Sequence, residues 1–229
     1  MKFRLFTLFV LAIGSATAQS FFPRFGVTGT SNSQNAEFTK MNPGAGFTAG
    51  AGYNQQINEW FSVQLEINYI QKAFSTTYEA SFTQNVGTDT YTVNEHIKSD
   101  YRLSYLEMPF LAKFHYKKAF ASIGPYGAYG LGGSYKYDRN STSSYFLEPV
   151  HESGSANVKF GSSKAHPTGN EFYFDNKLDI GLNAGLGVLL FENLVLECRY
   201  SRGSNLRDDG ESRNHTLQLT ASWLFHLQK

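Results

Sequence analysis

Cysteine is nearly absent from this sequence, which excludes two ways of stabilising a small protein. Cys198 is the single cysteine among 229 residues, so neither an internal disulfide framework nor a cluster of metal-binding thiolates can form. Small exported domains usually rely on disulfides. A sheet closed on itself is an alternative, because it pairs every backbone group without an exposed edge.

Long apolar runs are also lacking, and a transmembrane helix needs about 20 apolar residues. The apolar run at 5–13 is too short. It follows Lys2 and Arg4 and precedes the small residues of Ala16-Thr17-Ala18, which is the order of a secretory signal peptide. The sequence therefore predicts a signal peptide over 1–18.

Charge of one sign is not in excess, since 20 basic and 19 acidic residues give a formal net charge of +1. A nucleic-acid-binding domain usually carries a strong basic excess. We therefore expect no nucleic-acid partner.

Alternation of apolar and polar residues is abundant, and it is clearest near the C-terminus. The apolar members there are Leu217, Leu219, Ala221, Trp223, Phe225 and Leu227. A dozen alternating residues suit a transmembrane β-strand, which needs about 9–11 tilted residues. Because a bilayer offers no water to unpaired backbone groups, strands cross it only as a closed barrel.

The same alternation recurs in eight segments of the mature chain, 19–229. In one of them Leu65 and Ile67 point one way while Gln64 and Glu66 point the other. The fold class predicted is all-β, a closed antiparallel up-and-down transmembrane barrel of eight strands. The predicted strands are 23–33, 44–54, 60–73, 100–116, 119–136, 173–190, 194–204 and 213–227.

Short and long connections alternate between these segments. The short ones lie near 54–58, 117–118 and 191–193. In outer-membrane barrels the periplasmic turns are short and the extracellular loops are long, so both termini are expected in the periplasm. The predicted long extracellular loops are 34–43, 74–99, 137–172 and 205–212.

The 137–172 segment allows two interpretations besides a binding loop. A hairpin that extends the flanking strands above the membrane is favoured. Two additional membrane strands, giving ten, are the alternative, but Glu148 and Pro149 disfavour them because proline removes a ladder donor.

Two short turns allow the strand register to be predicted, because residues opposite each other across a hairpin share a face. At 117–118 a two-residue turn pairs Tyr116 with Ala119. At 191–193 an odd number of loop residues keeps Glu197 and Arg199 facing inward.

Five charged residues are predicted to face the lumen, namely Glu66, Glu107, Lys113, Glu197 and Arg199. Paired carboxylates can act as general acid and base. An eight-stranded barrel, however, is just wide enough to be filled by its own side chains, and buried charges persist there when paired. We therefore interpret the five residues as a structural lumen network and predict no catalytic, cofactor-binding or metal-binding residue.

Histidines in the long loops are the remaining candidates for a metal site. His96, His151 and His166 lie in two loops, with Glu95 and Glu152 beside two of them. Their spacing matches no ligand pattern. No cofactor is expected.

One motif lies on the fourth and fifth predicted strands. It reads Tyr-Leu-Glu-Met-Pro-Phe-Leu-Ala-Lys over 105–113, followed one short turn later by Gly-Pro. This pattern resembles the PorT-like outer-membrane β-barrel family of Gram-negative bacteria. The residues that carry the resemblance are Tyr105, Leu106, Glu107, Pro109, Lys113, Gly124 and Pro125.

The resemblance implies an eight-stranded barrel and says little about activity, since fold does not imply function. The prolines of the motif are unusual at strand centres, and a register set by the 117–118 turn brings Pro109 and Pro125 nearly opposite each other. We expect a local bulge or bend of the barrel wall there.

Two functions are compatible with these features. The first is a non-enzymatic, monomeric barrel in the Gram-negative outer membrane, surrounded by lipid, whose outer loops or wall engage a protein or surface in adhesion or secretion. Loops this long exceed what a simple connection needs. The second is a small porin-like channel for ions or solutes.

Overall fold

The computed structural model describes residues 18–33, 38–86, 89–144, 148–161, 171–174, 176–205 and 213–227. The predicted signal peptide, 1–18, lies outside these residues except for the backbone of Ala18, where the first strand begins. Within the described part of the chain, no helix has the length and apolar character needed to cross a membrane.

In the part of the chain that the structure describes, eleven strands form a single sheet. They are β1 (Ala18–Ser33), β2 (Thr39–Asn58), β3 (Phe61–Val86), β4 (Asp89–Tyr116), β5 (Ala119–Ser143), β6 (Val150–Phe160), β7 (Glu171–Phe174), β8 (Leu178–Leu190), β9 (Leu194–Asn205), β10 (Arg213–Trp223) and β11 (Phe225–Leu227).

Eight of these strands close into a ring. The order is β1-β2-β3-β4-β5-β8-β9-β10, and β10 pairs again with β1. Every pairing in the ring is antiparallel. The predicted eight-stranded antiparallel barrel is therefore confirmed.

β6 and β7 lie outside the ring, whereas β11 continues β10 along β1 in the same register. β6 pairs with β5, and the short β7 pairs with β6 in parallel. β11 pairs with the start of β1. The described residues of the 137–172 segment thus add no strand to the barrel wall, which closes with eight strands, and the ten-stranded alternative is wrong.

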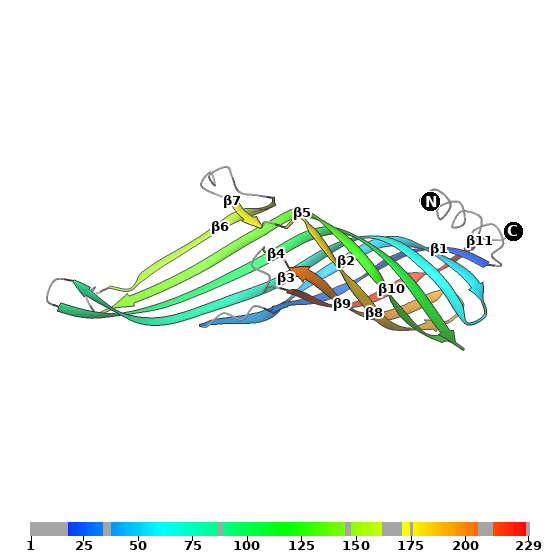
Figure 1. Cartoon of the computed structure of the whole chain (residues 1–229), viewed down its shortest axis with the longest axis horizontal. Helices are drawn as coiled ribbons and strands as arrows, with labels where there is room; N and C mark the ends of the chain where they lie inside the picture. The colour runs from blue at the N-terminus through cyan, green and yellow to red at the C-terminus, as the bar shows by residue number, and fades with distance from the viewer. Residues whose placement is uncertain are drawn as a thin grey trace, which may run out of the picture.

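The barrel has two different ends (Figure 1). The start of β1 and β11 lie at one end, which we call the terminal end. β3 and β4 extend far beyond the ring at the other, which we call the hairpin end.

The predicted connection 74–99 is not an irregular loop. The β3–β4 ladder continues through it from Ser75↔Asp100 to Val86↔Asp89. Threonine, tyrosine and valine favour strands there. Tyr78 pairs with Ile97 and Phe82 with Val93 on one face of the hairpin, but Glu95 lies between Val93 and Ile97 on that face and interrupts the apolar alternation that marks a membrane strand. The predicted loop over 74–99 is therefore mostly strand in the structure.

Exposure alternates along the ring strands as predicted. Leu65 and Ile67 are 52% and 54% exposed, whereas Glu66 between them is 1% exposed. The outward side chains form an apolar band, and the inward ones are mostly polar and buried.

Both register predictions are confirmed. Tyr116 pairs with Ala119 across the 117–118 turn. Across 191–193, Leu190 pairs with Leu194, which places Glu197 opposite Gly187.

The predicted bulge at the two prolines is absent. The β4–β5 ladder passes from Pro109↔Tyr126 to Ala112↔Ile123 without a change of register. The register shift of this pair lies instead between Ser104 and Tyr105, opposite Gly132, whose φ of 138° suits glycine.

Candidate functional site

Two arginines and two glutamates meet in the centre of the lumen. Arg199 on β9 donates to Glu66 through Nη1–Oε2 (2.9 Å) and Nη2–Oε1 (2.8 Å), and to Glu197 Oε2 through Nη2 (2.8 Å). Arg24 on β1 also pairs with Glu66, and its Nη2 lies 3.9 Å from Glu197 Oε2. All four side chains are buried. Because each carboxylate is shared by two guanidiniums, the four charges cancel without water.

Neutral donors complete this arginine–glutamate cluster. Asn68 donates through Nδ2 to Glu66 Oε2 at 2.7 Å. Ser122 on β5 donates through Oγ to Glu197 Oε1 at 2.9 Å. Buried carboxylates need several hydrogen bonds to remain charged, and the inward positions of neighbouring strands supply them.

A second charged group lies toward the hairpin end. Lys72 Nζ is 2.6 Å from Asp179 Oδ2 and 4.0 Å from Glu107 Oε2. It also lies 5.0 Å and 5.2 Å from the ring centroids of Tyr105 and Tyr126. The ammonium is therefore held by carboxylates and by aromatic faces together.

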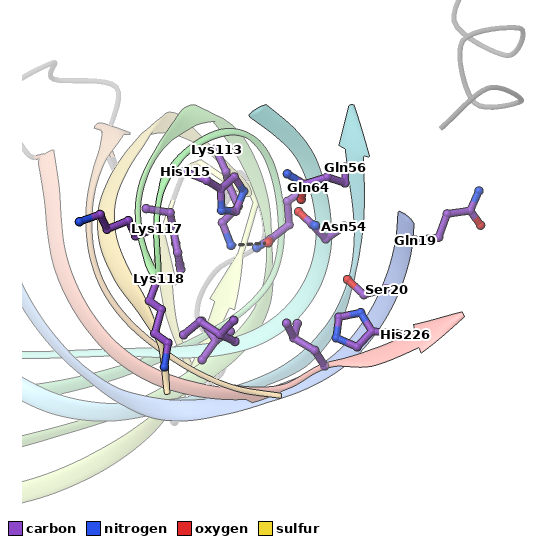
Figure 2. A pocket seen from close by; sticks show the side chains of 14 residues that line it. Gln19, Ser20, Asn54, Gln56, Gln64, Lys113, His115, Lys117, Lys118 and His226 are labelled. Atoms are coloured by element: carbon purple, nitrogen blue, oxygen red, sulfur yellow. Dashed lines mark hydrogen bonds between the residues drawn. The ribbon is translucent and has the colours of Figure 1, made fainter. Parts of the chain in front are cut away.

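Lys113 stands apart at the terminal end. Its Nζ donates to Gln64 Oε1 at 3.0 Å and lies 3.6 Å from the ring centroid of Phe120. Figure 2 shows this bond at the edge of a cavity of about 180 Å³. The cavity is also lined by His115, Lys117, Lys118, His226, Asn54 and Gln56.

Large side chains occupy the lumen between the two ends. Those that are fully buried include Arg24, Arg199, Tyr105, Lys72, Ile70, Leu103, Leu111, Gln218, Glu66, Glu107 and Asn68. An eight-stranded barrel has room for little besides its own side chains, and here long polar and apolar residues fill it.

Aromatic side chains cover the hairpin end of the lumen. Tyr101 on β4 stacks on Phe74 and contacts Tyr135, each with ring centroids 4.9 Å apart. Its ring also lies 5.8 Å from Phe172 and 6.0 Å from Phe174, both on β7. Aromatic contacts therefore hold β7 against the side chains of β3, β4 and β5 at the hairpin end.

The structure places all five predicted lumen residues inside the barrel. It brings Glu66, Glu197 and Arg199 together. Glu107 lies near Lys72, with Nζ and Oε2 4.0 Å apart. Lys113 has Gln64 as its hydrogen-bond partner.

Three charged members of the network were not predicted, namely Arg24, Lys72 and Asp179. The alternation of inward and outward positions could have identified them, because each of the three lies at an inward position of its strand. Lys72 lies on the same inward face of β3 as Glu66. Asp179 lies between the outward-facing Leu178 and Ile180.

The residues of the predicted family motif lie on both faces of the wall. Tyr105, Glu107, Pro109 and Lys113 face inward, whereas Leu106 and Pro125 are exposed outside. Gly124 has a packing role, because a Cβ at this position would lie 2.0 Å from the Phe110 carbonyl oxygen.

The two described loop histidines have different partners. His96 Nδ1 lies 3.4 Å from Glu79, and His151 Nδ1 lies 2.7 Å from Asn140 Oδ1. His166 is outside the described residues. Among the residues described, no group of three or more His, Cys, Asp or Glu side chains could hold a metal ion.

Comparison with known proteins gives one match to a family. The sequence model described as "Outer membrane protein beta-barrel domain" matches residues 18–206. The comparison with curated proteins finds no match.

Several solved structures are similar. Ail of Yersinia pestis is 14% identical, with a TM-score of 0.42 over 91% of this chain and 100% of Ail. Neisserial surface protein A is 10% identical, with a TM-score of 0.36 over 90% and 97% of the two chains. OprG of Pseudomonas aeruginosa is 12% identical, with a TM-score of 0.34 over 93% and 98%.

Proposed function

The chain belongs to the outer membrane protein beta-barrel domain family, and from this premise we propose that it is a non-conducting, non-enzymatic barrel whose projecting hairpins engage another macromolecule. We place the barrel in the outer membrane of a Gram-negative cell. The proposal includes a signal peptide over 1–18, a barrel over 19–229, and a monomer with lipid around its wall.

The proposal rests on the contrast between the filled lumen of the barrel and the sheet that projects beyond it. The lumen is filled by paired charges and large side chains. The projecting sheet continues β3, β4 and β5 well beyond the apolar band and adds β6 and β7 to them (Figure 1). A rigid scaffold that displays so much strand outside the membrane has a surface for binding.

The orientation proposed places the terminal end in the periplasm and the hairpin end outside the cell. Its support is the short turns at the terminal end, which are typical of the periplasmic side. Aromatic residues near those turns, including Trp60, Tyr116, Phe191 and Trp223, are exposed at the level of a membrane interface.

Exposed apolar residues on the projecting sheet favour a protein or cell-surface partner. Phe82 on β3 and Val150 on β6 are exposed outside the membrane band. Such residues are candidates for contact when a partner docks. The finer assignment to the PorT-like branch, and with it a partner in protein secretion, belongs to this proposal and is supported by the 105–113 motif.

Photocrosslinking in intact cells tests the proposal. A photoreactive amino acid is placed at Phe82 and, as a matched control, at Lys118 in a turn at the terminal end. We expect a discrete protein or surface-polymer adduct at position 82 in cells that display the barrel. Absence of any adduct at 82, or an adduct of the same mass at 118 alone, would contradict binding through the hairpins.

A porin-like channel is the second candidate. It would require water to pass the arginine–glutamate cluster and the Lys72 group, whose side chains are buried. Recording in planar bilayers separates the two functions.

A further inference from the structure

A groove runs across the lipid-facing surface of β5, β8 and β9. Its volume is about 540 Å³. Its floor consists of the small side chains Ala121, Ala184 and Cys198, and bulky residues such as Leu186 and Tyr200 form its sides. Since small residues alternate with large ones here, the apolar wall is hollowed at this position.

Basic side chains stand at the hairpin end of this groove. Arg202 follows Tyr200 at the next outward position of β9, and it pairs with His215 on β10 and with Leu182 on β8. Arg213 occupies the next outward position beyond His215. Both arginines are exposed, and within the described residues neither forms an ion pair.

The two guanidiniums lie close enough to act on one neighbour. Arg202 pairs with His215 across the β9–β10 ladder and Arg213 is the next outward residue of β10. His215 Nδ1 is 2.5 Å from Tyr200 Oη. Among the described residues at this edge, the positive charge therefore comes from the two arginines.

A second groove on the barrel provides an internal comparison. It has a volume of about 500 Å³ and is lined by residues that include Phe25, Phe47, Ala49 and Leu219. At its hairpin end the next outward positions on β1 and β2 are Gly29 and Ala45. An apolar groove of similar size thus exists without arginines on these two strands.

We propose that the first groove and the pair Arg202 and Arg213 together bind one lipid of the outer leaflet whose headgroup carries a phosphate monoester. An acyl chain occupies the apolar groove, and the phosphate lies between the guanidiniums. Arginine suits phosphate because it presents paired N–H donors, and a phosphate monoester carries a charge of about −1.5 to −2 at neutral pH. This assignment rests on the proposed orientation, with the hairpin end outside the cell.

The test is lipid binding by the folded barrel in dodecyl maltoside, measured by native mass spectrometry. The probes are dioleoyl phosphatidic acid, phosphatidylglycerol and phosphatidylcholine, which have the same chains and different headgroups. We expect phosphatidic acid to bind at least about tenfold more tightly than phosphatidylcholine, a difference of about 1.4 kcal/mol, with phosphatidylglycerol between them.

Substitutions separate the headgroup from the chain. In Arg202→Gln/Arg213→Gln, phosphatidic acid should bind no better than phosphatidylcholine. Ala184→Leu fills the groove and should weaken both lipids severalfold. The matched controls are Ala49→Leu in the second groove and Lys136→Gln on β5, and both should bind like the unaltered protein.

The unaltered barrel alone can overturn the proposal. Equal binding of phosphatidic acid and phosphatidylcholine contradicts the site, and equal binding of phosphatidic acid and phosphatidylglycerol contradicts the monoester. Heat-modifiable gel migration is checked on each sample. A folded barrel without lipid selectivity overturns only this site, whereas a chain that forms no heat-modifiable barrel contradicts the proposed function.

Discussion

Arg199 and Glu66 form a two-bond contact across the lumen, with Nη1–Oε2 at 2.9 Å and Nη2–Oε1 at 2.8 Å. They are 133 positions apart in the sequence and come from β9 and β3, which are not neighbours in the ring. The contact therefore joins separate parts of the wall, and its strength should be measurable as barrel stability.

Arg199→Met should lower the free energy of unfolding by about 3–5 kcal/mol, because it leaves buried carboxylates without their partner. Adding Glu66→Gln should recover part of this loss, since the uncompensated charge is then removed. Urea unfolding in detergent, analysed as a double-mutant cycle, measures the coupling. Asp179→Asn is the matched control, because that carboxylate pairs with Lys72. Additive effects of Arg199→Met and Glu66→Gln would contradict the cluster.

Leu219→Arg should impair insertion, because Leu219 is 57% exposed on the lipid face of β10. The expected cost is about 2–4 kcal/mol near the midplane. Phe82→Arg is the control, since Phe82 is 45% exposed on the projecting part of β3 and should tolerate the charge. The folded fraction is read as heat-modifiable migration after refolding into vesicles. Equal folding of the two variants would show that the membrane band is misplaced.

Phe174→Ala should detach β7 without opening the barrel. Phe174 is buried among Tyr101, Phe160 and Phe172, and loss of a buried phenylalanine costs about 3–5 kcal/mol. Hydrogen exchange should accelerate at the amides of β6 and β7 and stay unchanged in β9 and β10. Phe82→Ala, at an exposed ring, should change neither. Faster exchange throughout the ring would mean that β7 supports the barrel itself.

The sequence predicts the faces of the strands better than the contacts inside the ring. Alternation alone placed Glu66, Glu107, Glu197 and Arg199 inward, because side chains of a strand have a period of two. Which of them meet depends on the stagger with which the sheet closes. That stagger brings Lys72 to Asp179, 107 positions away, and no local pattern encodes it.

The projecting hairpin was missed for a different reason. Thr76, Thr77 and Tyr78 favour a strand, yet Glu95 lies between Val93 and Ile97 and interrupts the apolar alternation that marks a membrane strand. A prediction that searches for membrane strands therefore stops near Phe74, whereas the β3–β4 ladder runs on to Val86↔Asp89.

The filled lumen is the central claim, and conductance in planar bilayers tests it most directly. The purified, heat-modifiable barrel is reconstituted and recorded together with Arg199→Met and Lys72→Met, whose substituted residues lie in the two charged groups of the lumen. The account predicts no stable unitary conductance from the unaltered protein. Stable unitary steps that change in size in either lumen variant would contradict it.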